Sequence, residues 1–264
     1  MDDVITTAKT VPIDFDVAGA RFSFLDPDAS VAAETLEGFV YEPATTALLA
    51  RLLSHGAPTF LDVGAHYGYF TCFASALNPA ARVLAFEPGG KHFPVLEANI
   101  ALNGIGAEPL KLALSTEAGK VPFTDRTMKP KPGHEVEYIE TVAFDDYASR
   151  RGIRADVVKI DVHGAEGLVL GGMARTLRER VGHVLMEVHA EHILVGYDHA
   201  GIMAMLRDAG FHLYECARFR RTERPDLVPL EGDAYEAMVT PARWTEEQVK
   251  TERMVLASRA PFTF

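Results

Sequence analysis

Cysteine is scarce in this sequence. There are two cysteines among 264 residues, Cys72 and Cys216, which lie far apart and form no CxxC pair. A domain stapled by disulfides and a zinc site built from thiolates each need several closely spaced cysteines, so both are excluded. Unpaired thiols are typical of a reducing compartment, and we therefore expect a cytoplasmic protein.

Long apolar runs are also missing. No segment approaches the ~20 consecutive apolar residues that cross a bilayer. Residues 1–17 are acidic and contain no apolar stretch like that of a signal peptide. We therefore expect no membrane partner. Internal repeats and low-complexity tracts are absent as well, so an ordinary globular chain is expected.

Positive charge is in deficit. Lys and Arg number 26 against 37 Asp and Glu, which gives a formal net charge of −11. A polyphosphate backbone would be repelled by such a chain, so we expect no nucleic-acid partner. The hydrophobic content of 48% is enough for one sizeable core.

Short apolar segments alternate with longer amphipathic ones over most of the chain. This alternation is typical of βαβ units and predicts a mostly parallel, Rossmann-like sheet with helices on both faces. In such sheets, ligands bind beyond the carboxyl ends of the strands. We expect strands at 59–63, 82–88, 108–114, 155–162, 183–189 and 211–216, and helices at 44–54, 69–77, 92–104, 144–152, 164–180 and 200–210.

In the remaining segments the pattern of apolar residues predicts helices and strands less clearly. Residues 115–143 are expected to be irregular, and their Pro- and Lys-rich part, 124–135, is expected to form a surface loop or lid. Residues 234–239 could pair antiparallel with the strand at 211–216. We expect an N-terminal extension of short strands and a helix over residues 1–55, followed by one domain over 56–264.

The stretch "LDVGAHYGYF" (61–70) carries a ligand-binding pattern. Asp62 ends a buried strand, and Gly64 and Gly68 follow in the turn, where glycine lets backbone approach a ligand. The next strand ends in Glu87, whose carboxylate could accept two hydrogen bonds from a ribose diol. The pair predicts a nucleoside site. The alternative reading of DxGxxxG alone is an ordinary tight turn.

The turn lacks the GxGxxG fingerprint of dinucleotide enzymes. A pyrophosphate ligand is therefore disfavoured, and so is the alternative of a nicotinamide-dependent oxidoreductase. A nucleoside with an aminocarboxyl tail, as in S-adenosylmethionine, suits the pattern better.

Eight sequence blocks between residues 58 and 214 resemble FkbM-type S-adenosylmethionine-dependent methyltransferases. The resemblance implies the seven-stranded methyltransferase sheet, mostly parallel with an antiparallel last strand, and S-adenosyl-L-methionine as cofactor. It also implies methylation of a hydroxyl on a sugar, glycoconjugate or secondary metabolite, and hence a small-molecule or glycan substrate. The blocks are "FLDVGAHYGYFT" (60–71), "VLAFEP" (83–88), "EANIALNG" (97–104), "LALST" (112–116), "TVAFDDY" (141–147), "VVKIDVHGAEGLVLGG" (157–172), "LMEVH" (185–189) and "LRDAGF" (206–211).

The same resemblance implies roles for single residues. The expected cofactor-binding residues are Asp62, Gly64, His66 and Gly68 in the turn, Glu87 at the ribose, Ala113 and Ser115 at the adenine edge, and Asp161 near the sulfonium. The chain departs from the family pattern at two of its positions. His66 stands where Asn is usual, and His163 stands where Glu is usual. An inactive nucleoside-binding module is a further alternative, because both departures fall near the expected ligands.

Methyl transfer to a hydroxyl needs a positioned base, and imidazole suits this near neutral pH. His163 follows the fourth parallel strand and is expected to act as general base; the alternative is a loop histidine that shapes the pocket. Glu187 and His189 end the neighbouring strand and are expected, with Asp161, to serve catalysis or contact the substrate. A metal site of Asp161, Glu187 and His189 is an alternative, but we expect catalysis without a metal.

Other charged residues allow two readings each. Glu166 opens a helix, where its charge is favourable, or accepts from a substrate hydroxyl. Lys159 is expected to pair with a carboxylate inside the sheet. An arginine cluster follows the strand at 211–216 and reads as a solvated loop, or as a clamp for a substrate phosphate or carboxylate. Its members are Arg218, Arg220, Arg221 and Arg224.

Overall fold

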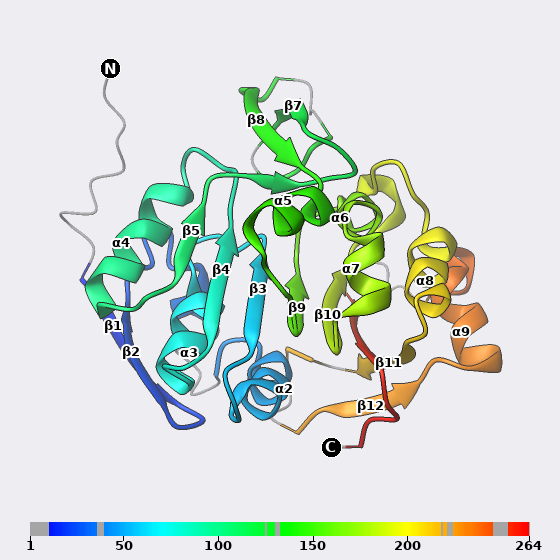
Figure 1. Cartoon of the computed structure of the whole chain (residues 1–264), viewed down its shortest axis with the longest axis horizontal. Helices are drawn as coiled ribbons and strands as arrows, with labels where there is room; N and C mark the ends of the chain where they lie inside the picture. The colour runs from blue at the N-terminus through cyan, green and yellow to red at the C-terminus, as the bar shows by residue number, and fades with distance from the viewer. Residues whose placement is uncertain are drawn as a thin grey trace.

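The computed structural model describes residues 11–35, 40–124, 126–129, 133–217, 219–220, 224–244 and 253–263. Its centre is a twisted sheet of eight strands in the order β12-β11-β13-β10-β9-β3-β4-β5 (Figure 1). The strands are β3 Thr59–Val63, β4 Arg82–Phe86, β5 Glu108–Leu110, β9 Val157–Ile160, β10 His183–Val188, β11 His212–Ala217, β12 Asp226–Pro229 and β13 Arg253–Ser258.

The directions of these strands confirm the expected methyltransferase sheet. β5, β4, β3, β9 and β10 pair in parallel, whereas β13 lies antiparallel between β10 and β11. β12 adds an eighth, antiparallel strand outside β11. Strands buried on both faces are mostly apolar, and "VVKI" in β9 and "TFLDV" in β3 are so apart from the buried charged residues Lys159 and Asp62.

The antiparallel partner of β11 was wrongly expected at residues 234–239. That segment lies in helix α9, Gly232–Val239, and the strand beside β11 is β13. All six residues of β13 are buried, as its place between two strands requires. Ala, Glu and Met favour a helix at 234–239, so the local alternation misled the sequence-based assignment.

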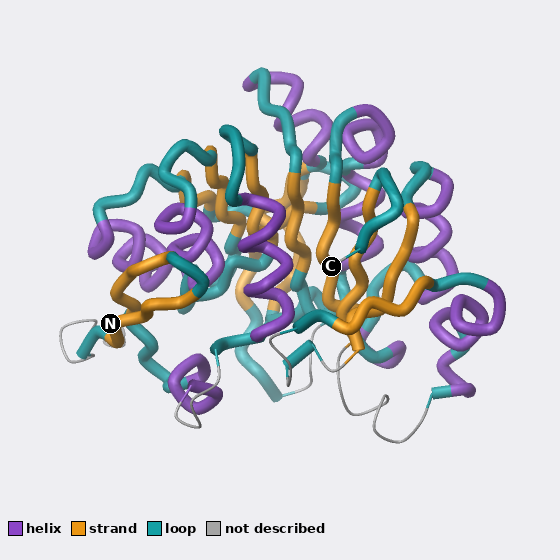
Figure 2. The backbone as a smooth tube through the Cα atoms, turned by 90° about the horizontal axis from the view of Figure 1, so that it is seen from below, coloured by secondary structure: helices purple, strands orange, loops and turns teal. Residues whose placement is uncertain are grey.

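Helices cover both faces of the sheet (Figure 2). α2 and α3 pack in one hydrophobic cluster, and α5 to α9 pack mainly in another on the opposite face. The helix expected at 164–180 is divided at Met173, directly after Gly171 and Gly172, because glycine is a poor helix former. The helices are α1 Ser30–Thr35, α2 Pro43–Leu53, α3 Tyr69–Leu77, α4 Phe93–Asn103, α5 Phe144–Arg151, α6 Glu166–Gly172, α7 Ala174–Glu179, α8 His199–Asp208 and α9; two 3-10 turns span Glu191–Ile193 and Pro241–Arg243.

A separate hairpin precedes the helices. β1, Ile13–Val17, pairs antiparallel with β2, Ala20–Phe24. Phe15 and Phe22 contact the ring of Tyr69 on α3, with centroids 5.2 and 5.3 Å apart. The hairpin thus shares its apolar cluster with α2 and α3. The division of the chain at residue 55 stays a prediction.

A second small sheet projects beyond the main one, at the top of Figure 1. The strand expected at 108–114 ends at Leu110, and β6, Ala113–Leu114, pairs instead with β8, Glu137–Val142. β7, Gly119–Phe123, pairs antiparallel with β8. The expectation of an irregular segment at 115–143 was therefore wrong. The strand β8 was missed because its buried and exposed residues alternate over only a few positions.

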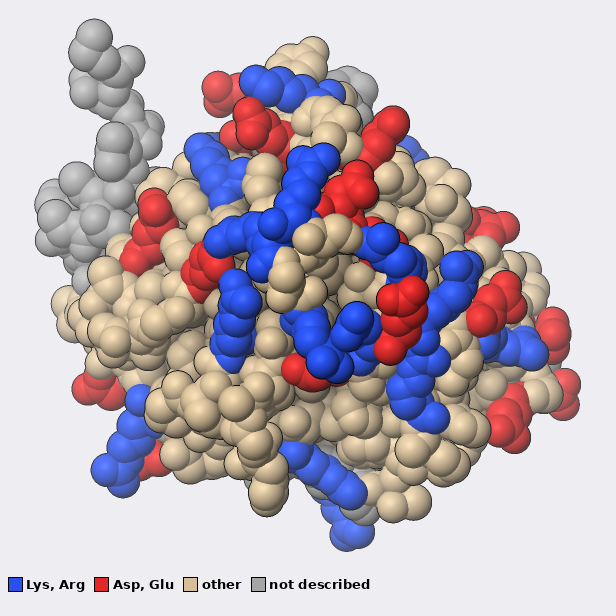
Figure 3. Space-filling model, in the orientation of Figure 1, with Lys and Arg blue, Asp and Glu red and all other residues tan. Residues whose placement is uncertain are grey.

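The charge is unevenly distributed over the surface. Figure 3 shows Lys and Arg side chains gathered in the middle of one face, in the region that α5 and α7 occupy in Figure 1. Exposed arginines of these helices and the turns that follow them are Arg150, Arg151, Arg154, Arg175, Arg178 and Arg180. The net charge of −11 thus does not describe this face, and the absence of a nucleic-acid partner stays a prediction. Among the described helices, none is long and apolar enough to traverse a bilayer.

Candidate functional site

The turn after β3 brings three strand ends together. Gly64 has φ of 82°, and a Cβ at this position would lie 1.8 Å from the carbonyl oxygen of Asp161. The backbone N–H groups of Gly64 and Ala65 both donate to the carbonyl oxygen of Phe86. Glycine is required here because the backbone of the β9 end leaves no room for a side chain.

Asp62 and Gly68 support this turn from within. Asp62 is buried and accepts a hydrogen bond from the Thr71 hydroxyl over 2.7 Å, while its other oxygen has no partner in the described chain. Burial raises the pKa of Asp62 despite the charge of Lys159. Gly68 begins α3 with φ of 87°, and a Cβ there would meet Leu96 at 2.5 Å. Gly68 therefore serves helix packing.

Glu87 ties the ends of β3 and β4 together. Its Oε1 accepts from the Gly89 N–H over 2.8 Å, and its Oε2 accepts from the His66 N–H over 2.9 Å. The His92 ring lies 3.5 Å from Oε1. A carboxylate can accept about four hydrogen bonds, so Glu87 keeps acceptor capacity for a ligand.

His66 lies in the left-handed backbone region, with φ of 52°. Its ring contacts those of Tyr67 and His92, with centroids 3.9 and 4.3 Å away. Burial, together with the charges of His92 and Arg126, lowers the pKa of His66 to about 3. The ring is therefore neutral near pH 7, and its buried Nε2 has no partner in the described residues.

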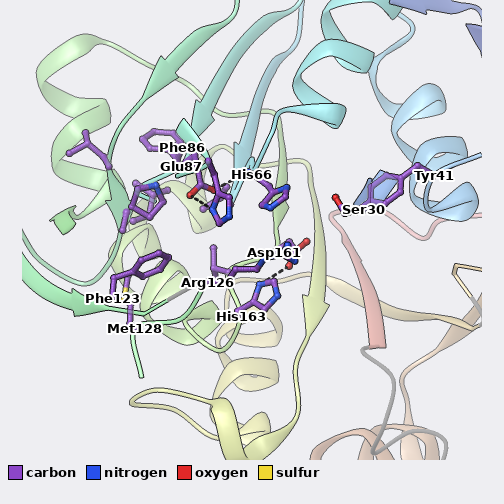
Figure 4. Close-up of a pocket in the computed structure, with 18 residues that line it drawn as sticks. Ser30, Tyr41, His66, Phe86, Glu87, Phe123, Arg126, Met128, Asp161 and His163 are labelled. Carbon is purple, nitrogen blue, oxygen red and sulfur yellow. Dashed lines mark hydrogen bonds and ion pairs between the residues drawn. The ribbon is translucent and has the colours of Figure 1, made fainter. Parts of the chain in front are cut away.

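These strand ends open into a cavity of about 110 Å³ (Figure 4). Glu87 and His66 lie on one side of the cavity, Asp161 and His163 lie on another, and Arg126 enters from the β7–β8 hairpin. The lining residues are Ser30, Tyr41, Val63, Gly64, His66, Phe86, Glu87, Pro88, His92, Leu112, Ala113, Leu114, Phe123, Arg126, Met128, Asp161, Val162 and His163.

A smaller cavity of about 30 Å³ adjoins it and shares Tyr41, Gly64, His66 and Asp161. Asp62 lines only this smaller space. Ser115, expected at the adenine edge, lines neither cavity, and its carbonyl oxygen lies against Gly172.

Sequence reasoning missed several lining residues. Ser30 and Tyr41 come from the N-terminal segment, and Phe123 comes from β7. No local pattern marks these three positions. Arg126 and Met128 fall in the expected loop at 124–135, whose length gave the only signal. Whether this loop acts as a lid stays a prediction.

Asp161 is the centre of the charged end of the cavity. Its Oδ2 lies 3.4 Å from Lys159 Nζ, and its Oδ1 lies 3.7 Å from His163 Nδ1 and 3.8 Å from His189 Nε2. Burial alone would raise the pKa of Asp161, but the charges of Lys159 and the two histidines lower it below its ordinary value. Asp161 is therefore a carboxylate at neutral pH.

The two histidines beside Asp161 differ. The ring of His163 is 36% exposed, and burial lowers its pKa although Asp161 opposes the shift. His189 is buried, and its Nδ1 lies 2.7 Å from Glu166 Oε1. Burial would lower the pKa of His189, but the hydrogen bond and charge of Glu166 and the charge of Asp161 raise it to about 9.

Glu166 does not reach the cavity. It is fully buried and also accepts a hydrogen bond from the Gly164 N–H over 3.0 Å. Its position therefore does not support the alternative of a contact with a substrate hydroxyl. Lys159 pairs with Asp161 inside the sheet, as the sequence predicted.

Glu187 is buried behind the cavity and bonds to Arg220 over 2.7 Å. Arg220 also lies 3.9 Å from the buried Glu42. Burial, with the charges of Asp161 and Glu42, raises the pKa of Glu187 well above its usual range. Arg220 thus balances two internal carboxylates, which speaks against a free clamp for a substrate anion. Arg218 and Arg221 lie outside the described residues.

The three strand ends lie in a part of the chain that is similar to known methyltransferases. Residues 62–213 match the sequence model of the methyltransferase FkbM domain. The chain is 28% identical over 218 residues to methyltransferase sdnD of Sordaria araneosa, covering 66% of this chain and 80% of that protein. It is 29% identical over 189 residues to the 31-O-demethyl-FK506 methyltransferase FkbM of Streptomyces tacrolimicus, covering 57% and 71%.

A third relative is the hexuronic acid methyltransferase AglP of Haloferax volcanii. The identity is 30% over 154 residues, which cover 56% of this chain and 61% of that protein. The similarity to AglP thus spans less than two thirds of its length.

Proposed function

The chain belongs to the FkbM family of S-adenosylmethionine-dependent methyltransferases, and from this premise we propose that it methylates a hydroxyl group on a sugar, glycoconjugate or secondary metabolite. One observation carries the proposal. A single cavity joins the Glu87 side, suited to a nucleoside, to the Asp161 and His163 side, suited to proton removal. One cavity would thus hold both ends of a methyl-transfer site.

The residues of the β3 and β4 ends suit the methyl donor. Glu87 would accept hydrogen bonds from the ribose diol, and Ala113 would lie at the adenine edge between apolar neighbours. Gly64 and His66 would lie beside the aminocarboxyl tail. Two buried polar atoms without partners in the described chain, Asp62 Oδ1 and His66 Nε2, support a polar ligand at this turn.

When bound, the donor would supply a methyl group on a positively charged sulfur. Methyl transfer would form an O–CH₃ bond and leave the electron pair of the S–CH₃ bond on sulfur. The acceptor hydroxyl would lose its proton. The chain's own task is to orient the hydroxyl and take up that proton. We assign this task to the cluster of Asp161, His163 and His189, because Asp161 and His163 line the cavity and His189 lies directly behind them.

The acceptor class rests on the relatives. The name of AglP gives hexuronic acid as its substrate, and that of the Streptomyces protein gives 31-O-demethyl-FK506. For this chain, Tyr41 and Arg126 lie on the cavity wall and are candidates to contact the acceptor.

Calorimetry with S-adenosylhomocysteine and with NAD tests the proposal. We expect S-adenosylhomocysteine to bind and NAD not to bind, because the turn after β3 has no GxGxxG. Binding of NAD without S-adenosylhomocysteine would replace the methyltransferase by an oxidoreductase. A panel of uronic acids, neutral sugars and macrolide alcohols, assayed by release of S-adenosylhomocysteine, then identifies the acceptor. Donor binding without turnover on any hydroxyl would favour an inactive binding module.

A further inference from the structure

Three side chains at the acceptor end of the cavity present potential metal-ligand atoms to one point. Each of Asp161, His163 and His189 offers one such atom, and all three atoms lie within 4.8 Å of one another. Two atoms that bind the same ion at ~2.1 Å are ~3.4 Å apart in tetrahedral geometry. The separations of 3.7 and 3.8 Å from Asp161 Oδ1 to the two imidazoles require only a small contraction.

We propose that Asp161, His163 and His189 bind one divalent transition-metal ion, of the zinc, cobalt or nickel kind, at the acceptor end of the cavity. The inference rests on the proposed function and names the agent that acidifies the acceptor hydroxyl. It also reverses the sequence-based preference for catalysis without a metal. The third ligand in this group is His163, whereas the metal site considered from the sequence combined Asp161 and His189 with Glu187.

The surroundings of His189 support a metal ligand. Its Nδ1 is held by Glu166 over 2.7 Å, which directs Nε2 toward Asp161. Metal-binding histidines usually donate their other N–H to a carboxylate or carbonyl oxygen, and this partner fixes the tautomer. Glu166 is itself oriented by the Gly164 N–H. The arrangement directs Nε2 to the ion, which binds there in place of the Nε2 proton.

Asp161 has one oxygen available. Lys159 lies against Oδ2, whereas Oδ1 is buried and accepts no hydrogen bond within the described residues. A buried carboxylate oxygen that accepts no hydrogen bond is costly, and a bound cation would satisfy it. Asp161 and His163 also line the cavity, so the ion would keep open positions toward the acceptor.

A second group of acids close by is less suitable. Glu42, Asp161 and Glu187 also place ligand atoms within 4.8 Å of one another. Arg220 lies 2.7 Å from Glu187 and 3.9 Å from Glu42, so a cation of the chain already occupies this group. The histidine-containing group is therefore the one we assign.

The ligand types indicate which ions bind. Imidazole nitrogen suits zinc, iron, nickel and copper, whereas carboxylate oxygen suits magnesium and calcium. His163 stands where the resembling family usually has glutamate, so this chain offers an imidazole nitrogen where a carboxylate oxygen is usual. A hydroxyl that coordinates such an ion loses its proton far more readily, as bound water does. With the ion bound, the O–H bond would break, its electron pair would stay on oxygen to attack the methyl group, and the proton would pass to the solvent.

The test uses the full chain without a histidine tag, dialysed against a chelator. Co²⁺ alone is titrated by calorimetry and by its visible absorption, and Zn²⁺ is then added as competitor. We expect one Co²⁺ per chain, displaced by Zn²⁺. His163→Ala should weaken Co²⁺ binding at least ~10-fold, and Glu166→Gln by ~10–100-fold, the usual cost of losing a carboxylate that orients a histidine ligand.

Two further variants sharpen the result. His163→Glu should lower Co²⁺ affinity and raise Mn²⁺ and Mg²⁺ affinity, because it restores an oxygen ligand. His192→Ala removes an exposed imidazole outside the cluster and should leave Co²⁺ affinity unchanged. Thermal melting of each variant checks the fold; His163 is partly exposed, so His163→Ala and His163→Glu remain informative if Glu166→Gln unfolds.

The outcomes separate this inference from the proposed function. No Co²⁺ binding, or binding that His163→Ala leaves unchanged, overturns the metal site. If S-adenosylhomocysteine still binds in that case, the methyltransferase stands and His163 acts as a free base. If Co²⁺ binds as expected but S-adenosylhomocysteine does not, the metal site stands and the proposed function fails.

Discussion

The backbone N–H of His66 donates a hydrogen bond to Glu87 Oε2 over 2.9 Å. One carboxylate thereby holds the turn after β3 against the end of β4, and its other oxygen holds Gly89. Glu87 is 5% exposed, so it shapes the cavity wall as well as offering oxygens to a ligand. A change at Glu87 should affect both stability and ligand affinity.

Glu87→Gln should weaken S-adenosylhomocysteine binding by about 10–100-fold, because a hydrogen bond to a charged group is worth ~1.5–3 kcal/mol. Glu87→Ala should also lower the free energy of unfolding by ~1–3 kcal/mol, since two backbone N–H groups lose their acceptor. Calorimetry and urea unfolding measure the two effects. Glu97→Gln on the exposed side of α4 is the control. Full affinity in Glu87→Gln would show that the ribose is held elsewhere.

Gly64→Ala should destabilise the chain severely. The added Cβ would lie 1.8 Å from the Asp161 carbonyl oxygen, and the φ of 82° is also unfavourable for alanine. Gly104→Ala is a matched control, because Gly104 has φ of 59° and nothing within 4 Å of the added atom. Gly104→Ala should lower the free energy of unfolding by only ~1–2 kcal/mol, because alanine is unfavourable in the left-handed backbone conformation. Equal unfolding free energies for the two variants would contradict the close approach of β3 and β9.

His66→Asn should make the protein less sensitive to acid. The folded pKa of His66 is about 3, against 6.5 for an ordinary histidine. The unfolded chain therefore binds a proton that the folded chain does not, and stability falls as the pH drops from 6.5 toward 3. Between pH 7 and pH 5 the variant should lose about 2 kcal/mol less than the wild type.

Urea unfolding at each pH measures this difference. His212→Asn, which removes an exposed imidazole on β11, is the control and should follow the wild type. An unchanged pH dependence in His66→Asn would mean that the ring is not buried in its neutral form.

Arg220→Gln should reduce stability, because the buried Glu187 then loses its ion pair. The guanidinium is one third exposed, so we expect ~1.5–3 kcal/mol, the value of a hydrogen bond to a charged group. Arg178→Gln, at an exposed site on α7, should change stability by less than ~0.5 kcal/mol. If Arg220→Gln melts like the wild type yet discriminates against anionic acceptors, Arg220 is a substrate clamp after all.

The sequence by itself determined the parallel strands and the edge at which the site lies, but not the antiparallel strands β12 and β13. Asp62 lies near the end of an apolar strand, and Glu87 and Asp161 each directly follow one; the carboxyl ends of parallel strands meet at one edge of a sheet. The glycine of the first turn was likewise readable, because only glycine tolerates its backbone and its crowded surroundings. Both features depend on residues that are neighbours in the sequence, so they can be predicted from the sequence.

Only the tertiary structure decided which charged groups meet. Glu187 turns to Arg220 and His189 to Glu166, although the sequence placed Glu187 and His189 together at one strand end. Glu187 lies within β10, whereas His189 follows its last residue, Val188, and the partners of both side chains come from elements distant in the chain. The same holds for Tyr41 and Arg126, which reach the cavity from the N-terminal segment and the β7–β8 hairpin because those segments pack over the strand ends.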